Sequence, residues 1–324
     1  MKAAIVYQKG EMPTYTETPD PIVQNENELL ITMKTAAIKN IDKSMASGKH
    51  YSTQGDINEA KVIGGDGVGL LENGTRVYAI GVSGMIAEKA VVEKNRMVAL
   101  PAGIDDITAA ALPNAVIGSA MAIRFKAEVK PGETVLINGA TGFTGRIAVQ
   151  VARYYGATKI IVTGRNEQSL QELLDIGADE IVSLNQTDEA FVAQLKNIHN
   201  RTPIDVILDY LWGHTAELIL LSLKGKGAFT HKTRFVSIGS VTGDIVQLSA
   251  ENLRSVDLQL SGSGLGSWTR EHIQELFHEI LPEMFQLAAD KKIKVDTIGV
   301  SLKDIEKLWE MDVPSGKRLV VVIN

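Results

Sequence analysis

From about residue 133 onward, short apolar segments of the chain alternate with segments of helical periodicity. Each apolar segment has the length of a strand, and the six of them span residues 134–138, 159–164, 180–184, 205–210, 234–239 and 256–262. Near-continuous apolar runs of this kind are typical of parallel strands that are covered on both faces. Because the connections are mostly helical, the pattern predicts an α/β fold with a doubly wound parallel sheet.

The regions on either side have a different texture, and 324 residues are enough for about two domains. Residues 1–100 are rich in β-forming segments broken by Gly, Pro and Asn. Residues 107–125 have helical spacing that we expect Pro113 to interrupt. Residues 269–292 predict an amphipathic helix that we expect Pro282 to kink. A further helix and a closing strand are predicted at 302–311 and 317–324.

Composition excludes several classes of function. The net charge of −6 counts against a nucleic-acid surface, which needs clustered Lys and Arg. The chain has no cysteine, which excludes disulfides and every zinc site with cysteine ligands. The apolar run near the amino terminus is shorter than the core of a signal peptide, and no run approaches the ~18 apolar residues of a membrane helix. We therefore expect a cytoplasmic protein.

The densest motif follows the first of the six predicted strands. Gly139, Gly142 and Gly145 form a G-x-x-G-x-x-G pattern between a strand and a helix. Gly139 permits a tight turn, Gly142 lets the backbone approach a pyrophosphate, and Gly145 allows the helix to pack closely on the strand. The helix N-terminus then faces an anion. We predict a dinucleotide site, with cofactor contacts from Gly139, Thr141, Gly142, Phe143, Thr144 and Gly145; the alternative is a tight turn without a ligand.

The end of the second predicted strand indicates which dinucleotide binds. An NAD site usually has an acidic residue there, about 20 residues after the last glycine, whereas this chain has Arg165. A guanidinium can pair with a 2′-phosphate through hydrogen bonds that contribute roughly 1.5–3 kcal/mol. The cofactor is therefore predicted to be NADPH, with Gly164 leaving room for the ribose and Asn166 beside the phosphate. Alternatively, Arg165 is an ordinary surface residue and Asn166 only caps the next helix; the two roles are compatible.

These motifs resemble those of a known family. The chain resembles the zinc-independent quinone oxidoreductases of the medium-chain dehydrogenase/reductase superfamily over essentially its whole length. The resemblance rests on the glycine turn and on segments 173–182, 204–213, 234–240, 36–51 and 62–69, the last of which looks like a glycine-rich turn of the family. It implies a Rossmann domain, residues 116–264, inserted into a GroES-like β-barrel domain, residues 1–115 and 265–324. It also implies a homodimer.

The chain departs from the family pattern in three places. Ala37 stands where zinc-dependent relatives have a catalytic cysteine, so no metal site is expected. Leu184 stands where the family often has an aromatic residue near the adenine. Residues 224–235 form a longer connection than usual, which would be a lid, an oligomer contact or a loop of no consequence.

Without zinc, hydrogen-bond donors must polarise the substrate carbonyl. The resemblance implies that hydride passes from the nicotinamide to a quinone or to the β-carbon of an α,β-unsaturated carbonyl. Asn40 and Tyr51 are the candidate catalytic donors, because they lie in the segment that resembles the family's active site. Asn40 could instead hold a turn, and Tyr51 could simply cover the cleft. Gly239 and Ser240, after the fifth strand, are expected to lie near the nicotinamide.

Two other functions remain open at this point. One is the reduction of an enoyl thioester or an aldehyde, because acceptor specificity depends on side chains from several loops. The other is a non-catalytic NADPH-binding sensor. The expected partner is a small carbonyl or quinone substrate, with neither nucleic acid nor membrane involved.

Overall fold

The computed structural model describes residues 1–48, 60–225 and 231–323. The chain forms two compact units, Met1–Asn114 with Gln274–Asn324, and Ala115–Ile273. The second unit is therefore inserted in the sequence of the first. The chain passes from one unit to the other within α2 (Asp106–Met121) and within α8 (Arg270–Glu275).

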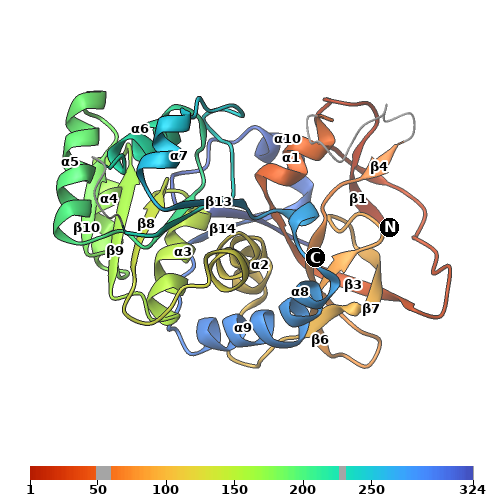
Figure 1. Ribbon diagram of the computed structural model, residues 1–324. Coiled ribbons are helices and arrows are strands. Elements are labelled where there is room, and N and C mark those ends of the chain that lie inside the picture. The colour runs from red at the N-terminus through yellow and green to blue at the C-terminus, as the bar shows by residue number, and fades with distance from the viewer. Residues whose placement is uncertain (49–59, 226–230, 324) are drawn as a thin grey trace. The chain divides into compact units, whose positions relative to one another are not determined.

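The inserted unit is built on a parallel six-stranded sheet in the order β10-β9-β8-β11-β12-β13 (Figure 1). The strands are β8 (Thr134–Asn138), β9 (Lys159–Gly164), β10 (Glu180–Ser183), β11 (Val206–Asp209), β12 (Thr233–Ser237) and β13 (Leu258–Gly262). Strands β9 and β10 lie on one side of β8, and β11, β12 and β13 lie on the other. The strand order therefore reverses between β8 and β11, which is the topology of a Rossmann sheet.

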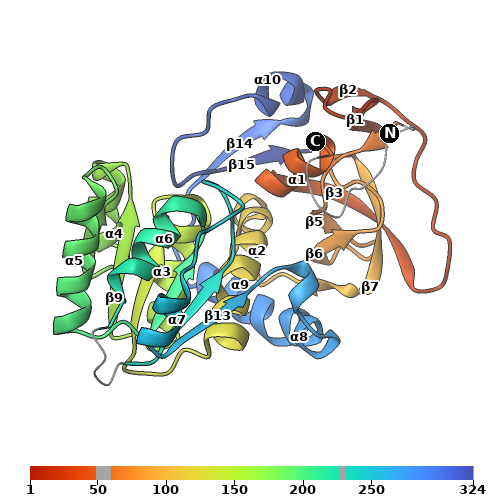
Figure 2. The ribbon, with the colours of Figure 1, turned by 45° about the horizontal axis from the view of Figure 1, so that its top comes forward.

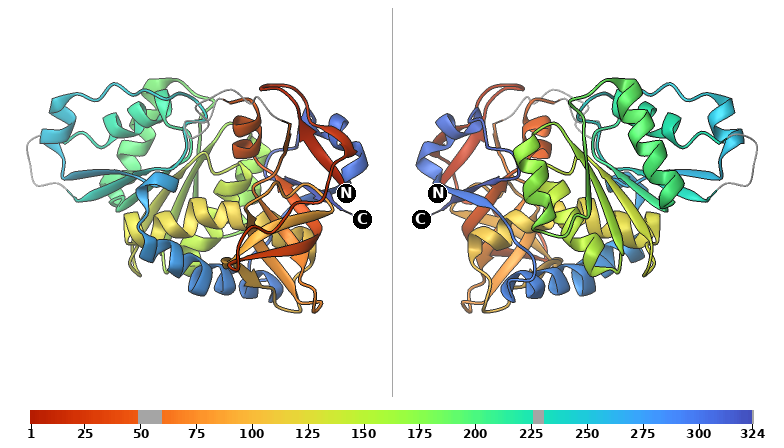
Figure 3. Two further views of the ribbon diagram at one scale, coloured as in Figure 1. Left: turned by 90° about the vertical axis from the view of Figure 1, so that its right-hand side faces the viewer. Right: turned by 90° about the vertical axis from the view of Figure 1, so that its left-hand side faces the viewer.

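Helices cover this sheet on both faces, as Figure 3 shows from two opposite sides. The helices between the strands are α3 (Phe143–Tyr154), α4 (Glu167–Leu174), α5 (Asp188–Arg201), α6 (Gly213–Ser222) and α7 (Ala250–Ser255). Helices α5 and α6 pack together over Leu136, Ile161 and Ile207. The neighbouring residues Ile137 and Leu208 point to the other face because side chains alternate along a strand, and both are fully buried. Burial on both faces explains the continuous apolar runs of the sequence.

The first unit contains a closed antiparallel barrel (Figure 2). Its strands are β3 (Glu28–Ile38), β5 (Asp66–Leu70), β6 (Arg76–Gly81) and β7 (Lys89–Ala99). Strand β3 pairs with β5 through residues 32–35 and with β7 through residues 28–32, which closes the ring. Strands β15 (Arg318–Val322) and β14 (Thr297–Ser301) continue the sheet from β3. The barrel and the inserted parallel sheet confirm the predicted fold class.

The remaining elements of the first unit are short. One of them is a separate sheet with the strand order β2 (Thr14–Glu17), β1 (Lys2–Val6) and β4 (Lys61–Val62). Helix α1 (Asn40–Ala46) follows β3, and α10 (Ile305–Trp309) lies between β14 and β15. The barrel core includes Ile31, Met33 and Val92 together with Trp309 of α10.

The glycines of segment 62–69 have another role than the predicted turn. Half of that segment belongs to β5, where an added Cβ on Gly67 would lie 2.6 Å from the carbonyl oxygen of Thr35. On Gly69 it would lie 2.7 Å from that of Thr32. The turn is therefore confined to the connection between β4 and β5, where Gly64 has a φ of +93°, and the prediction is wrong for Gly67 and Gly69, which let β3 and β5 pair closely.

Two prolines also differ from expectation. Helix α2 continues through Pro113 and runs on as the π-helical segment Ala122–Ala127, so the predicted interruption is wrong. Proline in a helix removes one backbone donor, and packing has outweighed that loss here. At Pro282, the expected irregularity takes the form of a π-helical turn, Leu276–Ile280, between α8 and α9 (Leu281–Ala289).

The segment Asp106–Ala127 is apolar as well as long. Within the described ranges it is the one helix with the length and hydropathy of a membrane span, and 67% of its most apolar stretch is buried in the structure. Polar residues and Pro113 interrupt the apolar residues of this segment, so it has no uninterrupted apolar run of membrane-span length. The core helix of a soluble protein meets the same criterion.

Candidate cofactor-binding site

The glycine turn joins β8 to α3 at the carboxyl edge of the sheet. Gly139 has a φ of +83°, in the left-handed region that favours glycine. Its N–H donates to the Thr163 hydroxyl over 3.1 Å. The next residue, Ala140, donates its N–H to the carbonyl of Thr163 over 2.9 Å. The turn is therefore fixed to the end of β9.

The other two glycines have the spatial roles that the motif requires. An added Cβ on Gly145 would lie 2.5 Å from the Cα of Ala140, so only glycine lets α3 approach the turn so closely. Gly142 is exposed and is the N-cap of α3. An added Cβ there would meet, among the described residues, only the Gly139 oxygen at 3.8 Å. The turn backbone is thus approachable at Gly142, and glycine provides no side chain to cap the head of α3.

The end of β9 brings together the residues predicted to choose the cofactor. An added Cβ on Gly164 would lie 2.4 Å from the Thr141 methyl group, so the space beside Gly164 holds Thr141. Arg165 is exposed, and within the described part of the chain no acidic side chain pairs with its guanidinium. Asn166 caps α4 by accepting the N–H of Ser169 over 2.8 Å. Asn185, after β10, donates to the Arg165 carbonyl over 2.5 Å and so fixes the backbone that carries the guanidinium.

A buried polar chain lies beneath the glycine turn, and the sequence analysis missed it. The Asn138 amide donates to Asp209 over 2.7 Å, and its oxygen accepts the Thr163 hydroxyl over 2.6 Å. All three residues are fully buried and lie at or next to the last positions of β8, β9 and β11. Burial raises the pKa of the Asp209 carboxyl, although Asn138 and backbone N–H groups oppose the shift. The signal in the sequence was a polar residue at the end of an otherwise apolar strand.

Gly239 and Ser240 follow β12 at the same edge of the sheet. The Gly239 N–H donates to the Asp209 carbonyl over 3.2 Å, and an added Cβ would lie 2.6 Å from the carbonyl oxygen of Tyr210. Ser240 is exposed. Leu184 packs against the apolar core between the sheet and helices α5 and α6.

The two candidate donors belong to the first unit. Asn40 is the first residue of α1 and is exposed, and no hydrogen bond holds its side chain among the residues described. Its amide is therefore able to donate to a ligand. Tyr51 lies outside the described residues.

A buried ionic cluster supports the segment that carries Asn40. The Lys39 ammonium contacts Asp66 and lies 3.3 Å from Asp42, and the Tyr78 hydroxyl donates to Asp66 over 2.6 Å. Burial alone would lower the pKa of Lys39, but the two carboxylates raise it, so the ammonium stays charged. Asp42 also accepts the backbone N–H of Lys39 over 2.9 Å at the start of α1. Within the described residues, no group of three or more His, Asp or Glu side chains is arranged to hold a metal ion.

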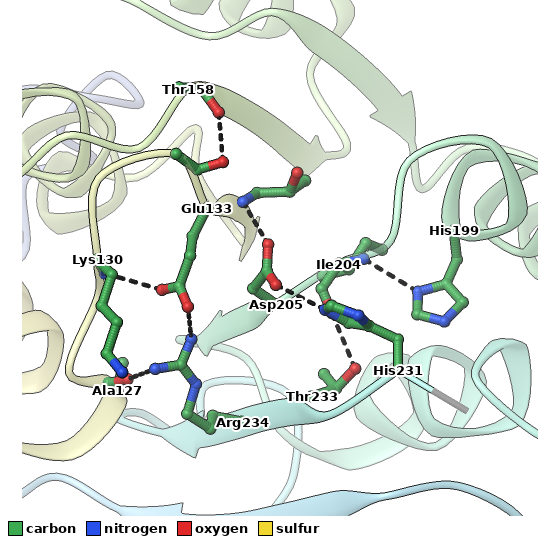
Figure 4. Close-up of polar contacts among 12 residues, drawn as sticks. Ala127, Lys130, Glu133, Thr158, His199, Ile204, Asp205, His231, Thr233 and Arg234 are labelled. Atoms are coloured by element: carbon green, nitrogen blue, oxygen red, sulfur yellow. Dashed lines mark hydrogen bonds and ion pairs between the residues drawn. The ribbon is translucent and has the colours of Figure 1, made fainter. Parts of the chain in front are cut away.

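A second polar cluster, shown in Figure 4, lies at the opposite edge of the parallel sheet. Asp205, just before β11, accepts the Thr134 N–H over 2.7 Å and lies 2.6 Å from Nε2 of His231. Arg234 of β12 pairs with Glu133 over 2.5 Å. These contacts fasten the amino ends of the strands. They are remote from the glycine turn along each strand, so they have a structural role.

Two-domain dehydrogenases and reductases share this architecture: a parallel sheet with reversed strand order, a glycine turn at its switch point and a barrel in the other unit. A family model described as zinc-binding dehydrogenase matches residues 144–283. Quinone oxidoreductase 1 of Escherichia coli is 30% identical over 300 residues, which cover 88% of each chain. A probable NADPH-dependent quinone reductase of Emericella nidulans is 26% identical over 99% of this chain and its own full length.

Solved structures agree on the fold. A mycobacterial quinone oxidoreductase superposes with a TM-score of 0.84 at 20% identity, covering 99% of both chains. The quinone oxidoreductase of Thermus thermophilus, also solved with NADPH, superposes with a TM-score of 0.79 at 24% identity over 99% of this chain and 100% of its own. The chain belongs to the quinone oxidoreductase-like family of the medium-chain dehydrogenase/reductase superfamily, which is a family of oxidoreductases.

Proposed function

We propose that this protein uses NADPH to reduce a quinone or an α,β-unsaturated carbonyl compound without a metal ion. The observation that carries the proposal is the glycine turn at the switch point of the sheet, with the exposed guanidinium of Arg165 at the end of the next strand. The relative from Emericella nidulans, named a probable NADPH-dependent quinone reductase, supports the same assignment.

The residues at the turn fit the cofactor. The exposed backbone at Gly142 and the head of α3 would hold the diphosphate, because helix N-termini present N–H groups to anions. Arg165 would pair with the 2′-phosphate, and Asn166 would lie beside it while capping α4. Gly239 and Ser240 follow a strand in the second half of the sheet, where the nicotinamide half of a dinucleotide binds in Rossmann folds.

The chemistry of the chain's own residues is positioning and charge stabilisation. When bound, reduced nicotinamide supplies the hydride. The Asn40 amide would donate a hydrogen bond to the substrate oxygen, where negative charge develops, and Tyr51 is the second proposed donor. One fixed donor of this kind is typically worth ~2.7–4 kcal/mol in the transition state. The lack of cysteine supports chemistry without zinc. We further propose that the protein acts in the cytoplasm as a homodimer.

The cofactor assignment is tested by replacing Arg165. Kd values for NADPH and NADH are measured by nicotinamide fluorescence for the wild type and for Arg165→Asp. Loss of a charge-assisted contact should weaken NADPH binding by about ten- to a hundredfold, and NADH binding by far less. Arg254→Asp, at an exposed arginine of α7, is the matched control and should leave both values unchanged. Equal losses for NADPH and NADH in Arg165→Asp would reject the choice of cofactor.

The activity is tested by following nicotinamide absorbance with a panel of quinones, enones, aldehydes and enoyl thioesters. We expect turnover with quinones or enones, and an unchanged rate after dialysis against a chelator. Tight binding of NADPH without turnover of any acceptor would support the sensor and reject the enzyme.

A further inference from the structure

The pairing of β8 with β11 brings two polar side chains together at the point where the strand order reverses. Asn138 and Asp209 are register partners and the last residues of their strands. In a Rossmann sheet a dinucleotide crosses this switch point, with one half over each set of three strands. The pair therefore lies beneath the middle of the proposed cofactor, and the proposed function gives it no role.

On one side, the pair is connected to the glycine turn. Asn138 accepts the Thr163 hydroxyl over 2.6 Å, and that hydroxyl accepts the Gly139 N–H over 3.1 Å. The first residue of the turn, whose positive φ sets the course of the backbone, is thus held by a series of side-chain hydrogen bonds that ends at Asn138.

On the other side, the pair is connected to the turn after β11, residues 209–213. The Asp209 carboxylate accepts the N–H of Leu211 over 3.0 Å and that of Trp212 over 3.1 Å. Trp212 has a φ of 58° and a ψ of −157°, a combination that is essentially restricted to glycine. Strain of this kind persists only where the surroundings hold it, and the Asp209 carboxylate is one of the groups that hold it.

The two turns also touch. An added Cβ on Gly139 would lie 2.8 Å from the side chain of Leu211, so Leu211 covers the first glycine of the motif. A change in the shape of the 209–213 turn would therefore alter the surface over which the cofactor crosses.

We propose that Asn138 and Asp209 form a positioning pair that fixes the glycine turn and the 209–213 turn relative to each other. The pair aligns the nicotinamide half of the bound cofactor with its diphosphate. This inference rests on the proposed function. Neither residue touches the cofactor in this account, since both are fully buried and act through the backbone of the two turns.

The test exchanges the two side chains. Asn138→Asp places two carboxylates together, and Asp209→Asn removes the charged acceptor. The double variant, Asn138→Asp with Asp209→Asn, restores the hydrogen bond between the two strands with the donor and acceptor reversed. In it the new carboxylate on β8 would accept the Thr163 hydroxyl, and the new amide oxygen on β11 would accept the Trp212 N–H. The readouts are Kd for NADPH, Kd for 2′,5′-ADP, which carries the 2′-phosphate but no nicotinamide, and kcat with a quinone.

We expect each single variant to lower kcat and to weaken NADPH binding by about tenfold or more, because hydrogen bonds to charged buried groups have that weight. Binding of 2′,5′-ADP should change by less than about threefold, and the double variant should recover part of both losses, as expected for a coupled pair. A purely structural role would instead weaken the fragment and the whole cofactor together. If a single variant folds poorly, recovery in the double variant shows that the broken contact between positions 138 and 209 caused the defect.

Asp205→Asn is the matched control, because Asp205 lies just before the same strand and its carboxylate also accepts a backbone N–H, at the opposite edge of the sheet (Figure 4). It should lower stability and leave the ratio of the two Kd values unchanged. Suppose that the wild type binds NADPH and reduces the quinone. If the single variants then behave like Asp205→Asn, or if the double variant recovers neither kcat nor NADPH binding, the proposed pair alone is overturned. A wild type that does not bind NADPH would overturn the proposed function as well.

Discussion

At the scale of the residue, Trp212 is the most unusual position in the described chain. It is the N-cap of α6, and its ring packs at an angle against Phe235, with 6.0 Å between the ring centres. Its backbone occupies a region where a Cβ is strained, at a cost of order 1–3 kcal/mol. The carbonyl of Trp212 accepts the Thr242 hydroxyl over 2.9 Å, and its N–H donates to Asp209. The site therefore contains stored strain held by several hydrogen bonds.

That strain can be measured by comparing Trp212→Gly with Trp212→Ala. Both variants lose the ring, so their difference reports the backbone. Glycine is normally less stable than alanine by roughly 0.5–1 kcal/mol within an element. Here we expect the glycine variant to be the more stable by about 1–3 kcal/mol in urea unfolding, because only glycine adopts this backbone without strain.

The control for this comparison is another N-cap with ordinary backbone. Thr187 caps α5 with a φ of −69°, so Thr187→Gly and Thr187→Ala should differ only by the usual preference at a helix start. If the advantage of glycine at position 212 does not exceed that at position 187, the backbone of Trp212 is not strained.

At the scale of the element, the parallel sheet was the part most readily predicted from the sequence. Strands β8 and β9 begin and end where their apolar runs do, and the other four differ by one or two residues at an end. This follows from burial on both faces, which leaves a local signal in the sequence. The barrel was predicted only through the family resemblance, because its closure depends on the pairing of β3 with β7 across about sixty residues.

The candidate site was predictable to the extent that it is local. The glycine turn and the cap at Asn166 are each contained in one short stretch, and the structure has both. The Asn138–Asp209 contact joins residues 71 positions apart, and only the register of β8 against β11 brings them together. The buried contact of Lys39 with Asp66 is non-local in the same way. The roles of Asn40, Tyr51 and the cofactor residues stay predictions.

The junction of α5 with β11 should make stability depend on pH. Nδ1 of His199, in the last turn of α5, accepts the Ile204 N–H over 3.1 Å, which requires a neutral ring (Figure 4). Burial lowers the pKa of His199 below its ordinary 6.5, and the nearby His231 adds to the shift. The unfolded chain therefore binds the proton more readily than the folded one. The contribution of His199 to the free energy of unfolding is therefore complete above pH 6.5 and is lost as the pH falls below that value.

His199→Asn should remove this dependence, because the amide oxygen can accept the same N–H and does not titrate. The free energy of unfolding is measured in urea at several pH values between about 7.5 and 5. We expect it to fall less towards acid in the variant than in the wild type. An equal fall in both proteins would show that His199 does not control this junction.

At the scale of the whole molecule, the parallel sheet ends at β13 with an edge that no described strand covers. Strand β13 pairs with β12 on one side, and no described strand pairs with its other side. An open edge presents unpaired backbone groups and invites pairing with another chain. Leu260, in the middle of β13, is 37% exposed. A second copy of the chain, related by a two-fold axis, would cover this edge and continue the sheet.

The proposed homodimer therefore predicts a mass in solution of twice the 35.1 kDa of the chain, measured by light scattering during gel filtration. Leu260→Lys should shift the protein towards the monomer, because a charge at an edge strand opposes pairing and loses the apolar contact. Leu174→Lys, at a leucine of α4 that is 41% exposed, is the matched control and should leave the mass unchanged. A monomeric wild type would reject the dimer. A dimer that both variants leave intact would show that its interface lies elsewhere than β13, and the edge strand would then need another cover.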